Sequence, residues 1–366
     1  MIGRFGSALI AAGIAVAGAV HLAAQEPRTV LPPEYLTALA SYRAGNLAGA
    51  LASLDELGDR HVLDVTKQLM RPGVVEPRLW PRLMTAAILL HTEIFFVRVE
   101  AGNILIQDPF LISAHNLTRR LLKLAEDGEP FIGEDQRRFA LEWYLLVVAY
   151  RHGRGEVGWS RAYIEEARKA FPLEPRLALA LGADHEMLSV LTAGYLRQFD
   201  TTGRLRREGF LDPEDELADS LRYFKEAARM APESIEARLR LGRGLYQIGD
   251  LEGAARELDA ARVLKGPATV KYLVLLFRGM VEAARGALEA ADPLYAEALA
   301  LVPLAQSGVV ARSEAAYLRG RSTEAASAML ALLGRNKKDD PWWLYIQGQW
   351  WHFEERLARL RAQVQE

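Results

Sequence analysis

The stretch at residues 235–266 reads IEARLRLGRGLYQIGDLEGAARELDAARVLKG, and its apolar residues recur three and four positions apart on both sides of Gly249. This spacing places apolar side chains on one face of an α-helix, and the glycine between the two halves is a residue type that ends helices. Small residues at Gly242 and Ala254 predict a close crossing of two helices, because a larger side chain would hold them apart. The stretch therefore predicts two helices joined by a turn and packed against each other.

The same pattern recurs along the second half of the chain. Equivalent positions give repeat starts near Thr201, Ile235, Tyr272, Gln306 and Asp340, so three of the four steps are 34 residues long and one is 37. One helical pair cannot bury its apolar face alone, and pairs therefore stack on one another. Good helix formers dominate the composition, and strand-like alternation is scarce. The predicted fold class is all-α, an α-solenoid of stacked antiparallel helix pairs.

The order of small and bulky residues within one period resembles the tetratricopeptide repeat (TPR). A small residue stands in the first helix, glycine at the turn, and alanine, a bulky residue, alanine and proline in the second helix: Gly279, Gly286, Ala291, Tyr295, Ala298 and Pro303. The resemblance is clear over residues 215–329 and extends to residues 31–64, where the matching residues are Ala38, Gly45, Ala50 and Leu54. It implies a TPR-like superhelix. The chain is similar in this respect to exported bacterial TPR proteins, which serve secretion, polymer export or envelope assembly.

The N-terminal residues have the pattern of a secretory signal. Arg4 precedes an apolar run from Ala8 to Val20, and small residues follow as far as Ala24. This order predicts a signal peptide over residues 1–24 with cleavage after Ala24, or an N-terminal membrane anchor if the signal is not cleaved. Residues 25–33 are an extended, proline-containing leader, and no later segment is long and apolar enough to span a membrane. We therefore expect an exported protein of the periplasm or the extracellular space.

The rest of the chain divides into three parts by the strength of the repeat pattern. Residues 34–200 are helical with a degenerate TPR-like pattern, residues 201–339 carry the clear TPR array, and residues 340–366 form a tryptophan-rich end. Four of the seven tryptophans fall within the ten residues 342–351 of this end. Its aromatic and aliphatic residues recur on one helical face: Trp343, Ile346, Trp350, Phe353, Leu357 and Leu360. This spacing predicts a final helix that caps the array, with Trp342 and Trp351 left exposed.

Composition and motifs exclude several kinds of chemistry. The chain has no cysteine, which excludes disulfides, thiolate metal sites, iron–sulfur clusters and cysteine nucleophiles. A net charge of −2 gives no overall field that would attract nucleic acid. The motif Asp184-His185-Glu186 has no second histidine nearby to complete a metal site, and it predicts a polar helix face. We expect no cofactor, no metal and no catalytic residue.

The predicted function is a protein–protein interaction scaffold or adaptor of the bacterial cell envelope, without catalysis. Stacked repeats curve, and side chains of the first helices line the concave surface. The candidate partner-binding residues lie on the first helix of one repeat and among the C-terminal aromatics: Arg238, Arg240, Arg243, Gln247, Trp342 and Trp351. The expected partner is a protein or peptide, and no nucleic acid.

Two other hypotheses stay open at the level of sequence. An enzyme with a helical solenoid body, active on the cell wall, would need a catalytic region, and residues 65–140 lack the repeat signature and contain Glu93, Glu100 and Asp108. A self-assembling structural protein would instead dock its tryptophan-rich end on another copy of the chain.

Overall fold

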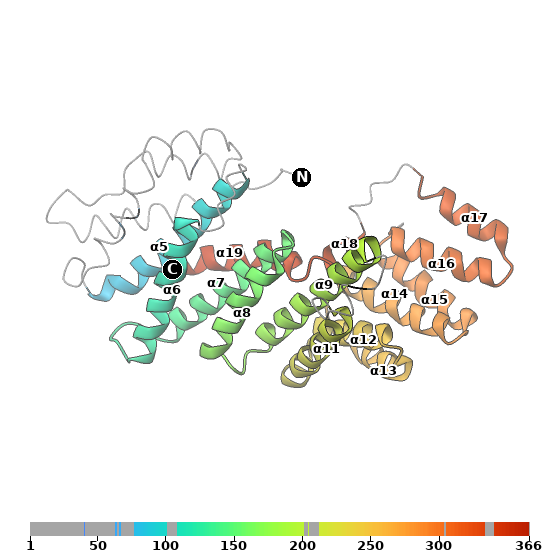
Figure 1. The fold of residues 1–366 in the computed structure, drawn as a ribbon, viewed down its shortest axis with the longest axis horizontal. Helices are drawn as coiled ribbons and strands as arrows, with labels where there is room; N and C mark the ends of the chain where they lie inside the picture. Colours follow the sequence, from blue (N-terminus) through green and yellow to red (C-terminus); the bar gives the residue numbers. More distant parts are fainter. Residues whose placement is uncertain are drawn as a thin grey trace. The chain divides into compact units, whose positions relative to one another are not determined.

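A computed structural model describes residues 77–100, 108–200, 212–303, 305–333 and 340–365, together with the isolated positions 40, 63, 66 and 204. Within these residues every regular element is a helix (Figure 1). No helix in this described part is both long and apolar enough to cross a membrane. The predicted signal peptide, the leader and the repeat start at Thr201 lie outside the described residues, as does the repeat at residues 31–64 apart from positions 40 and 63.

The chain divides into two compact units. The first comprises the residues up to Tyr144 together with Glu354–Glu366, and the second comprises Leu145–Phe353. Helix α7 spans the boundary and contributes residues to both units. The described helices of the first unit are η1 (Pro77–Leu79), α5 (Trp80–Glu100), α6 (Pro109–Glu126), the start of α7 (Glu134–Gly153) and most of α19 (Phe353–Gln365).

Helix α5 forms the centre of the first unit, and nearly all of its side chains are buried. Helix α6 packs against it and is capped at its start by Asp108, whose carboxylate accepts hydrogen bonds from the backbone amides of Phe110 and Leu111. Arg361 of α19 donates a hydrogen bond of 2.7 Å to the buried Glu93 of α5. This ion pair joins the C-terminal helix to the centre of the unit.

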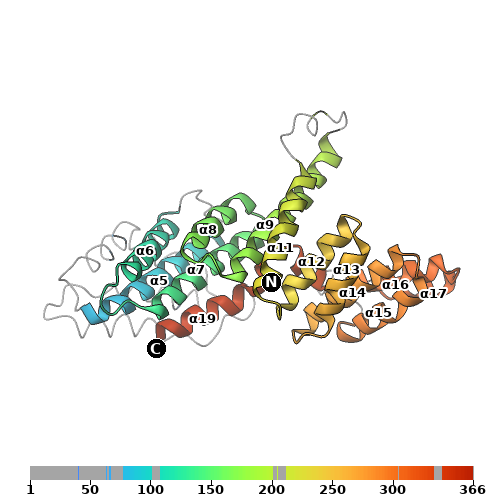
Figure 2. The ribbon, with the colours of Figure 1, turned by 90° about the horizontal axis from the view of Figure 1, so that it is seen from below.

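The second unit is a succession of helical pairs. Its helices before residue 340 are the second half of α7, α8 (Val157–Ala170), α9 (Pro175–Phe199), α11 (Pro213–Met230), α12 (Ile235–Gln247), α13 (Leu251–Arg262), α14 (Ala268–Ala284), α15 (Leu288–Leu301), α16 (Gln306–Leu318) and α17 (Ser322–Leu330). Four pairs pack in chain order, α9 with α11, α12 with α13, α14 with α15 and α16 with α17, and each packs on the next (Figure 2). The predicted α-solenoid is thus confirmed.

Local sequence sets where these helices begin and end. The side chains of Ser234 and Asp250 cap the starts of α12 and α13 by accepting hydrogen bonds from backbone amides of the first turn. Gly249 follows α12 with a positive φ of 83°, a conformation that ends helices and that glycine adopts without strain. Gly286 and Gly320 occupy the equivalent positions after α14 and α16. Helices α12 and α16 begin at the predicted repeat starts, and α14 begins four residues before the predicted Tyr272.

Glycines allow the two helices of a pair to approach closely. A Cβ atom at Gly242 of α12 would overlap Leu258 of α13, and one at Gly279 of α14 would overlap Tyr295 of α15. Gly182 of α9 meets Phe224 of α11 in the same way. The close crossing predicted at Gly242 is confirmed, and the contact of a small residue with a bulky one repeats from pair to pair.

The C-terminal end differs from the predicted continuous helix over residues 340–366. It consists of α18 (Pro341–Tyr345), η3 (Trp350–His352) and α19. The interruption falls at Gly348, which has a positive φ of 61° and no space for a Cβ beside His152 and Met187. Residues 340–352, which we name the inner segment, do not cap the end of the array. They lie against helices α9, α12 and α14 of the second unit.

Candidate functional site

Four charged side chains are buried on the faces of α9 and α12 that meet the inner segment. Glu186 projects from α9, and Glu236, Arg240 and Arg243 project from successive turns of α12. Arg240 has no solvent-exposed surface. Burying charges costs free energy unless each one has a well-placed partner, so the partners define what this face holds.

The two carboxylates hold the two arginines. Glu186 accepts a hydrogen bond of 2.8 Å from Nη1 of Arg240 and pairs with Arg243 through its other oxygen. Glu236 lies one helical turn before Arg240 and accepts a 2.9 Å hydrogen bond from its Nε. Arg240 is therefore fixed from two sides, and its guanidinium is oriented toward the inner segment.

The inner segment binds this cluster through its backbone. Nη2 of Arg240 donates to the carbonyl oxygen of Gly348 at 2.7 Å and to that of Tyr345 at 3.4 Å. The hydroxyl of Tyr345 donates to Glu186 at 2.9 Å. Because carbonyl oxygens are common to all residues, Arg240 recognises a polypeptide here rather than one particular side chain.

Glu236 accepts hydrogen bonds from the end of the inner segment. Nε2 of Gln349 donates at 3.0 Å and Nε1 of Trp351 at 3.2 Å, while the ring of His352 hydrogen-bonds its other oxygen at 2.6 Å. Burial alone would raise the pKa of Glu236, but the charges and hydrogen bonds of His352 and Arg240 outweigh burial and lower this pKa to about 2.

Aromatic rings of the inner segment cover the two arginines. The guanidinium of Arg240 lies 4.3 Å from the ring centre of Tyr345 and 5.4 Å from that of Trp351, and Arg243 lies 4.9 Å from that of Trp342. Such cation–π contacts are stronger when water is excluded, as it is here. Burial lowers the pKa of Arg240, but Tyr345, Glu236 and Glu186 raise it above its ordinary value, so the arginine stays charged.

Two further contacts hold the ends of the inner segment. Asp340 accepts a hydrogen bond of 2.9 Å from the hydroxyl of Ser307 on α16. The backbone amide of Gln349 donates to Nδ1 of His152 at 3.1 Å, which requires the tautomer with the proton on Nε2. That Nε2 lies 3.3 Å from Asp184.

Four of the six predicted binding residues come together around the inner segment. Arg240 contacts Trp351 and Arg243 contacts Trp342, both tryptophans being part of the inner segment. The two tryptophans are partly buried and not exposed as predicted, whereas Trp343 is 41% exposed. Gln247 lies at the edge, where it accepts a hydrogen bond from Arg243. Arg238 faces elsewhere, toward Glu257 and the carbonyl of Pro232. That this set binds a partner stays a prediction, because the chain's own residues occupy it.

Sequence reasoning did not identify Glu186 as the centre of the cluster. The motif Asp184-His185-Glu186 was expected on a polar helix face, but all three residues are buried. Asp184 holds His152 and Arg161, and His185 hydrogen-bonds Glu216. The sequence contained one signal for such a residue. Glu236, Arg240 and Arg243 share one face of α12, and two buried arginines beside one glutamate need a second carboxylate as a partner. No group of residues suited to a metal ion occurs among the described residues.

Two of the three carboxylates considered for catalysis, Glu93 and Asp108, have structural partners. Glu93 pairs with Arg361, and Asp108 caps α6 and lies 3.2 Å from Nε of Arg98. The pKa of Glu100 is raised by burial and by the nearby Glu354.

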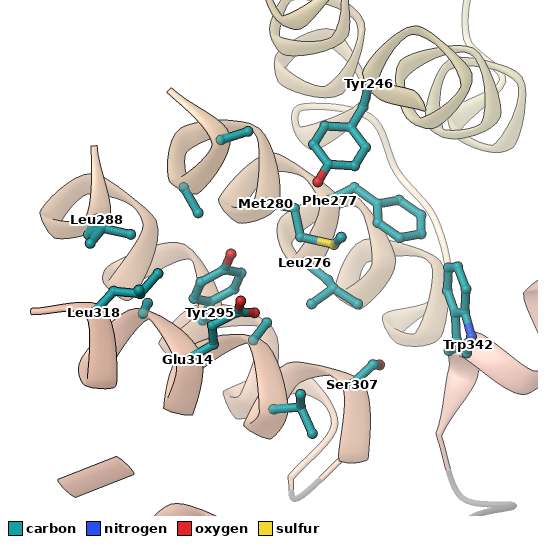
Figure 3. Close-up of a pocket in the computed structure, with 15 residues that line it drawn as sticks. Tyr246, Leu276, Phe277, Met280, Leu288, Tyr295, Ser307, Glu314, Leu318 and Trp342 are labelled. Carbon is teal, nitrogen blue, oxygen red and sulfur yellow. The ribbon is translucent and has the colours of Figure 1, made fainter. Parts of the chain in front are cut away.

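A cavity of about 450 Å³ opens next to the inner segment. Figure 3 shows side chains from α12, α14, α15 and α16 around it, with Trp342 of the inner segment as one wall. The lining residues labelled in Figure 3 are Tyr246, Leu276, Phe277, Met280, Leu288, Tyr295, Ser307, Glu314, Leu318 and Trp342.

We name the surface of α9, α12, α14 and α16 on which the inner segment lies the inner face. The stacked pairs and the repeated glycine crossings define an α-solenoid of antiparallel helix pairs, the fold that the resemblance to the tetratricopeptide repeat implies. No family model matches the sequence, and no curated protein matches it. Among solved structures, MamA is similar over 52% of this chain and 88% of its own, at 18% identity and a TM-score of 0.38. The pilF protein of Pseudomonas aeruginosa is similar over 61% and 90%, at 14% identity and a TM-score of 0.44. A tetratricopeptide repeat protein from Parabacteroides merdae is similar over 90% and 98%, at 13% identity and a TM-score of 0.42. At these values the likeness carries no argument about function, and the fold rests on the helix pairs of this chain.

Proposed function

We propose that this protein is a scaffold of the bacterial cell envelope that binds a protein partner along the inner face of its repeats. One observation carries the proposal: the inner face already holds a stretch of polypeptide, the inner segment, through backbone carbonyls and aromatic rings. A surface that binds one polypeptide in this way has the chemistry to bind another. The proposal assigns no catalytic step to the chain.

The inner face continues beyond the inner segment, which leaves room for a partner. Beyond Phe277 and Trp342, the inner face is formed by helices α14 and α16. Apolar side chains of α16 are exposed on it. Val310 and Leu318 of α16 are 39% and 61% exposed, which for apolar residues that line a cavity indicates a contact surface. The partner would bind here, beside the inner segment.

Site-specific photo-cross-linking in intact cells tests this scaffold function. The photoreactive residue p-benzoylphenylalanine replaces Val310 on the inner face or, as a matched control, the exposed Val263 that follows α13. We expect one defined adduct from position 310 and none from position 263, with mass spectrometry naming the partner and the reciprocal pull-down confirming it. Equal labelling at both positions, or no adduct at position 310, would contradict the proposal.

The assignment to the envelope rests on residues 1–24 of the sequence and is part of the same proposal. N-terminal sequencing of the protein from fractionated cells tests it. A mature chain that begins at Gln25 in the periplasmic or secreted fraction supports export with cleavage. A chain that retains Met1 in the membrane fraction supports an uncleaved anchor, and one that retains Met1 in the cytoplasm overturns export.

A further inference from the structure

The cavity beside Trp342 has apolar walls and a polar mouth. Leu276, Met280 and Leu288 form part of its wall, with Phe277 and Trp342 on the side of the inner segment. Its volume of about 450 Å³ lies within the roughly 300–1,000 Å³ typical of pockets that bind ligands. The cavity is thus large enough for more than one side chain.

Three polar groups face this cavity. The carboxylate of Glu314 and the hydroxyls of Tyr246 and Tyr295 point into it in Figure 3. Among the described residues, none of the three makes a hydrogen bond or an ion pair. The pKa of Tyr295 is raised, first by burial and then by Tyr246 and Glu314, so its hydroxyl stays neutral. Together the three groups offer one negative charge and two hydroxyl oxygens.

Arginines on the helices around the cavity pair with other carboxylates and not with Glu314. Arg243 pairs with Glu186, Arg278 with Asp259 and Glu282, and Arg312 and Arg319 with Asp292. Within the described part of the chain, Glu314 is therefore a free carboxylate beside the cavity. A ligand that presents only donors and a positive charge would complement it.

A basic side chain has both properties that the cavity requires. The aliphatic stem of lysine or arginine packs against apolar walls, and its cationic head binds carboxylates, hydroxyls and aromatic faces. The cavity adjoins the inner segment, because Phe277 and Trp342 line the cavity and also border the occupied part of the inner face. Their ring centres lie 5.7 Å apart. We therefore expect the ligand to be a polypeptide.

We propose that this cavity is the specificity site for the partner and receives a lysine or arginine next to an apolar residue, with the cationic head held by Glu314 and by the hydroxyls of Tyr246 and Tyr295. The proposal rests on the scaffold function and names the chemistry of its partner. Binding is non-covalent, and the inner segment stays in place.

Selection from phage-displayed random dodecapeptides on the full-length protein tests the proposal. We expect enriched sequences to share a lysine or arginine adjacent to leucine, methionine or phenylalanine. For the most enriched synthetic peptide, Glu314→Gln should weaken binding about fivefold, the upper end for a partly exposed ion pair. Replacing the basic residue of the peptide by glutamine should give a similar loss, and the two changes together should add little more.

Three further variants distinguish binding in this cavity from effects of overall charge or of folding. Glu289→Gln removes an exposed carboxylate of α15 that does not line the cavity, and it should leave binding unchanged. Ala311→Phe fills the cavity from α16 and should abolish binding, while thermal unfolding confirms that the variant is folded. Glu314→Lys should shift the selection toward peptides that contain aspartate or glutamate.

Three results would overturn the inference: no enriched peptide, enriched peptides without a basic residue, or unchanged affinity in Glu314→Gln. These results are distinguishable from failure of the scaffold function. If Val310 still cross-links to a partner while Glu314→Gln has no effect, the scaffold function stands and the basic-side-chain site is wrong. If position 310 gives no adduct, the scaffold function itself fails.

Discussion

Glu186 is the residue on which the buried cluster of the inner face depends. It is the shared partner of Arg240, Arg243 and the Tyr345 hydroxyl, so its removal would leave two buried guanidinium groups short of negative charge. We expect Glu186→Gln to lower the free energy of unfolding by about 3–5 kcal/mol, because breaking a buried ion pair from one side leaves an uncompensated charge. Urea denaturation followed by circular dichroism measures this loss.

The control for that variant is a carboxylate of the same kind at a more exposed place. Glu226 accepts a 2.8 Å hydrogen bond from Arg168, and both side chains are about a quarter exposed. Glu226→Gln should therefore change the free energy of unfolding by less than about 1 kcal/mol. Similar losses for the two variants would show that burial of the cluster does not matter.

The ionisation of Glu236 makes the stability of the folded chain depend on pH. Its pKa is about 2 in the folded chain and has an ordinary value of 4.5, so the folded state favours its ionised form. The stabilisation is therefore complete above about pH 4.5 and is lost as the pH falls toward 2; at full ionisation it amounts to roughly 3 kcal/mol. Unfolding in urea at pH 6, 4 and 3 should show wild type converging on Glu236→Gln as the pH falls. A constant difference between the two would refute this assignment.

At the scale of the helical pair, Gly242 determines how closely α12 and α13 pack. A Cβ at this position would lie 2.6 Å from Cγ of Leu258. We expect Gly242→Ala to cost about 1–3 kcal/mol of unfolding free energy, the range for overpacking a core. At Gly194 of α9, by contrast, an added Cβ would meet no atom within 4 Å, so Gly194→Ala should instead stabilise the chain by up to about 1 kcal/mol.

A second substitution tests whether contact with Leu258 causes the loss. Leu258→Ala makes space for the new methyl group, so the double variant Gly242→Ala, Leu258→Ala should lose less free energy than the sum of the two single variants. Strict additivity, measured by thermal and urea unfolding, would mean that the glycine is needed for another reason.

At the scale of the whole molecule, the inner segment connects helices that are far apart in the sequence. Tyr345 is 1% exposed, and it contacts Glu186, Arg240 and Phe277 on three different helices. Tyr345→Ala should remove about 3–5 kcal/mol of stability and speed amide hydrogen exchange in α9 and α12, roughly 100 or more residues away along the chain.

The conservative variant identifies what the ring itself contributes. Tyr345→Phe keeps the ring and loses the hydroxyl with its hydrogen bond to Glu186, so it should cost about 1 kcal/mol and leave most of the protection in α12. Mass spectrometry resolves the exchange helix by helix. Unchanged exchange in α9 and α12 of Tyr345→Ala would show that the inner segment does not stabilise them.

Local patterns in the sequence were sufficient to predict the repeated architecture. Helical spacing, the 34-residue period and the glycine at each turn act between residues close in the chain, and α12 and α16 begin where this period places them. The crossing at Gly242 was predictable for the same reason, since it joins two consecutive helices. Arg240 and Arg243 were found as residues of the inner face because the helical period gives the direction in which they project.

Interactions between neighbouring residues thus specify the helices, their pairing and the face that the first helices present. What lies on that face depends on contacts between residues far apart in the chain. The heptad-like spacing of the C-terminal aromatics is compatible with a capping helix, yet Gly348 interrupts it and the inner segment binds Arg240 instead. The pairing of Glu186 with residues 54 to 159 positions away depends on how successive helical pairs stack. No local spacing records that geometry. The position of Glu314 beside a cavity depends on the folded chain for the same reason.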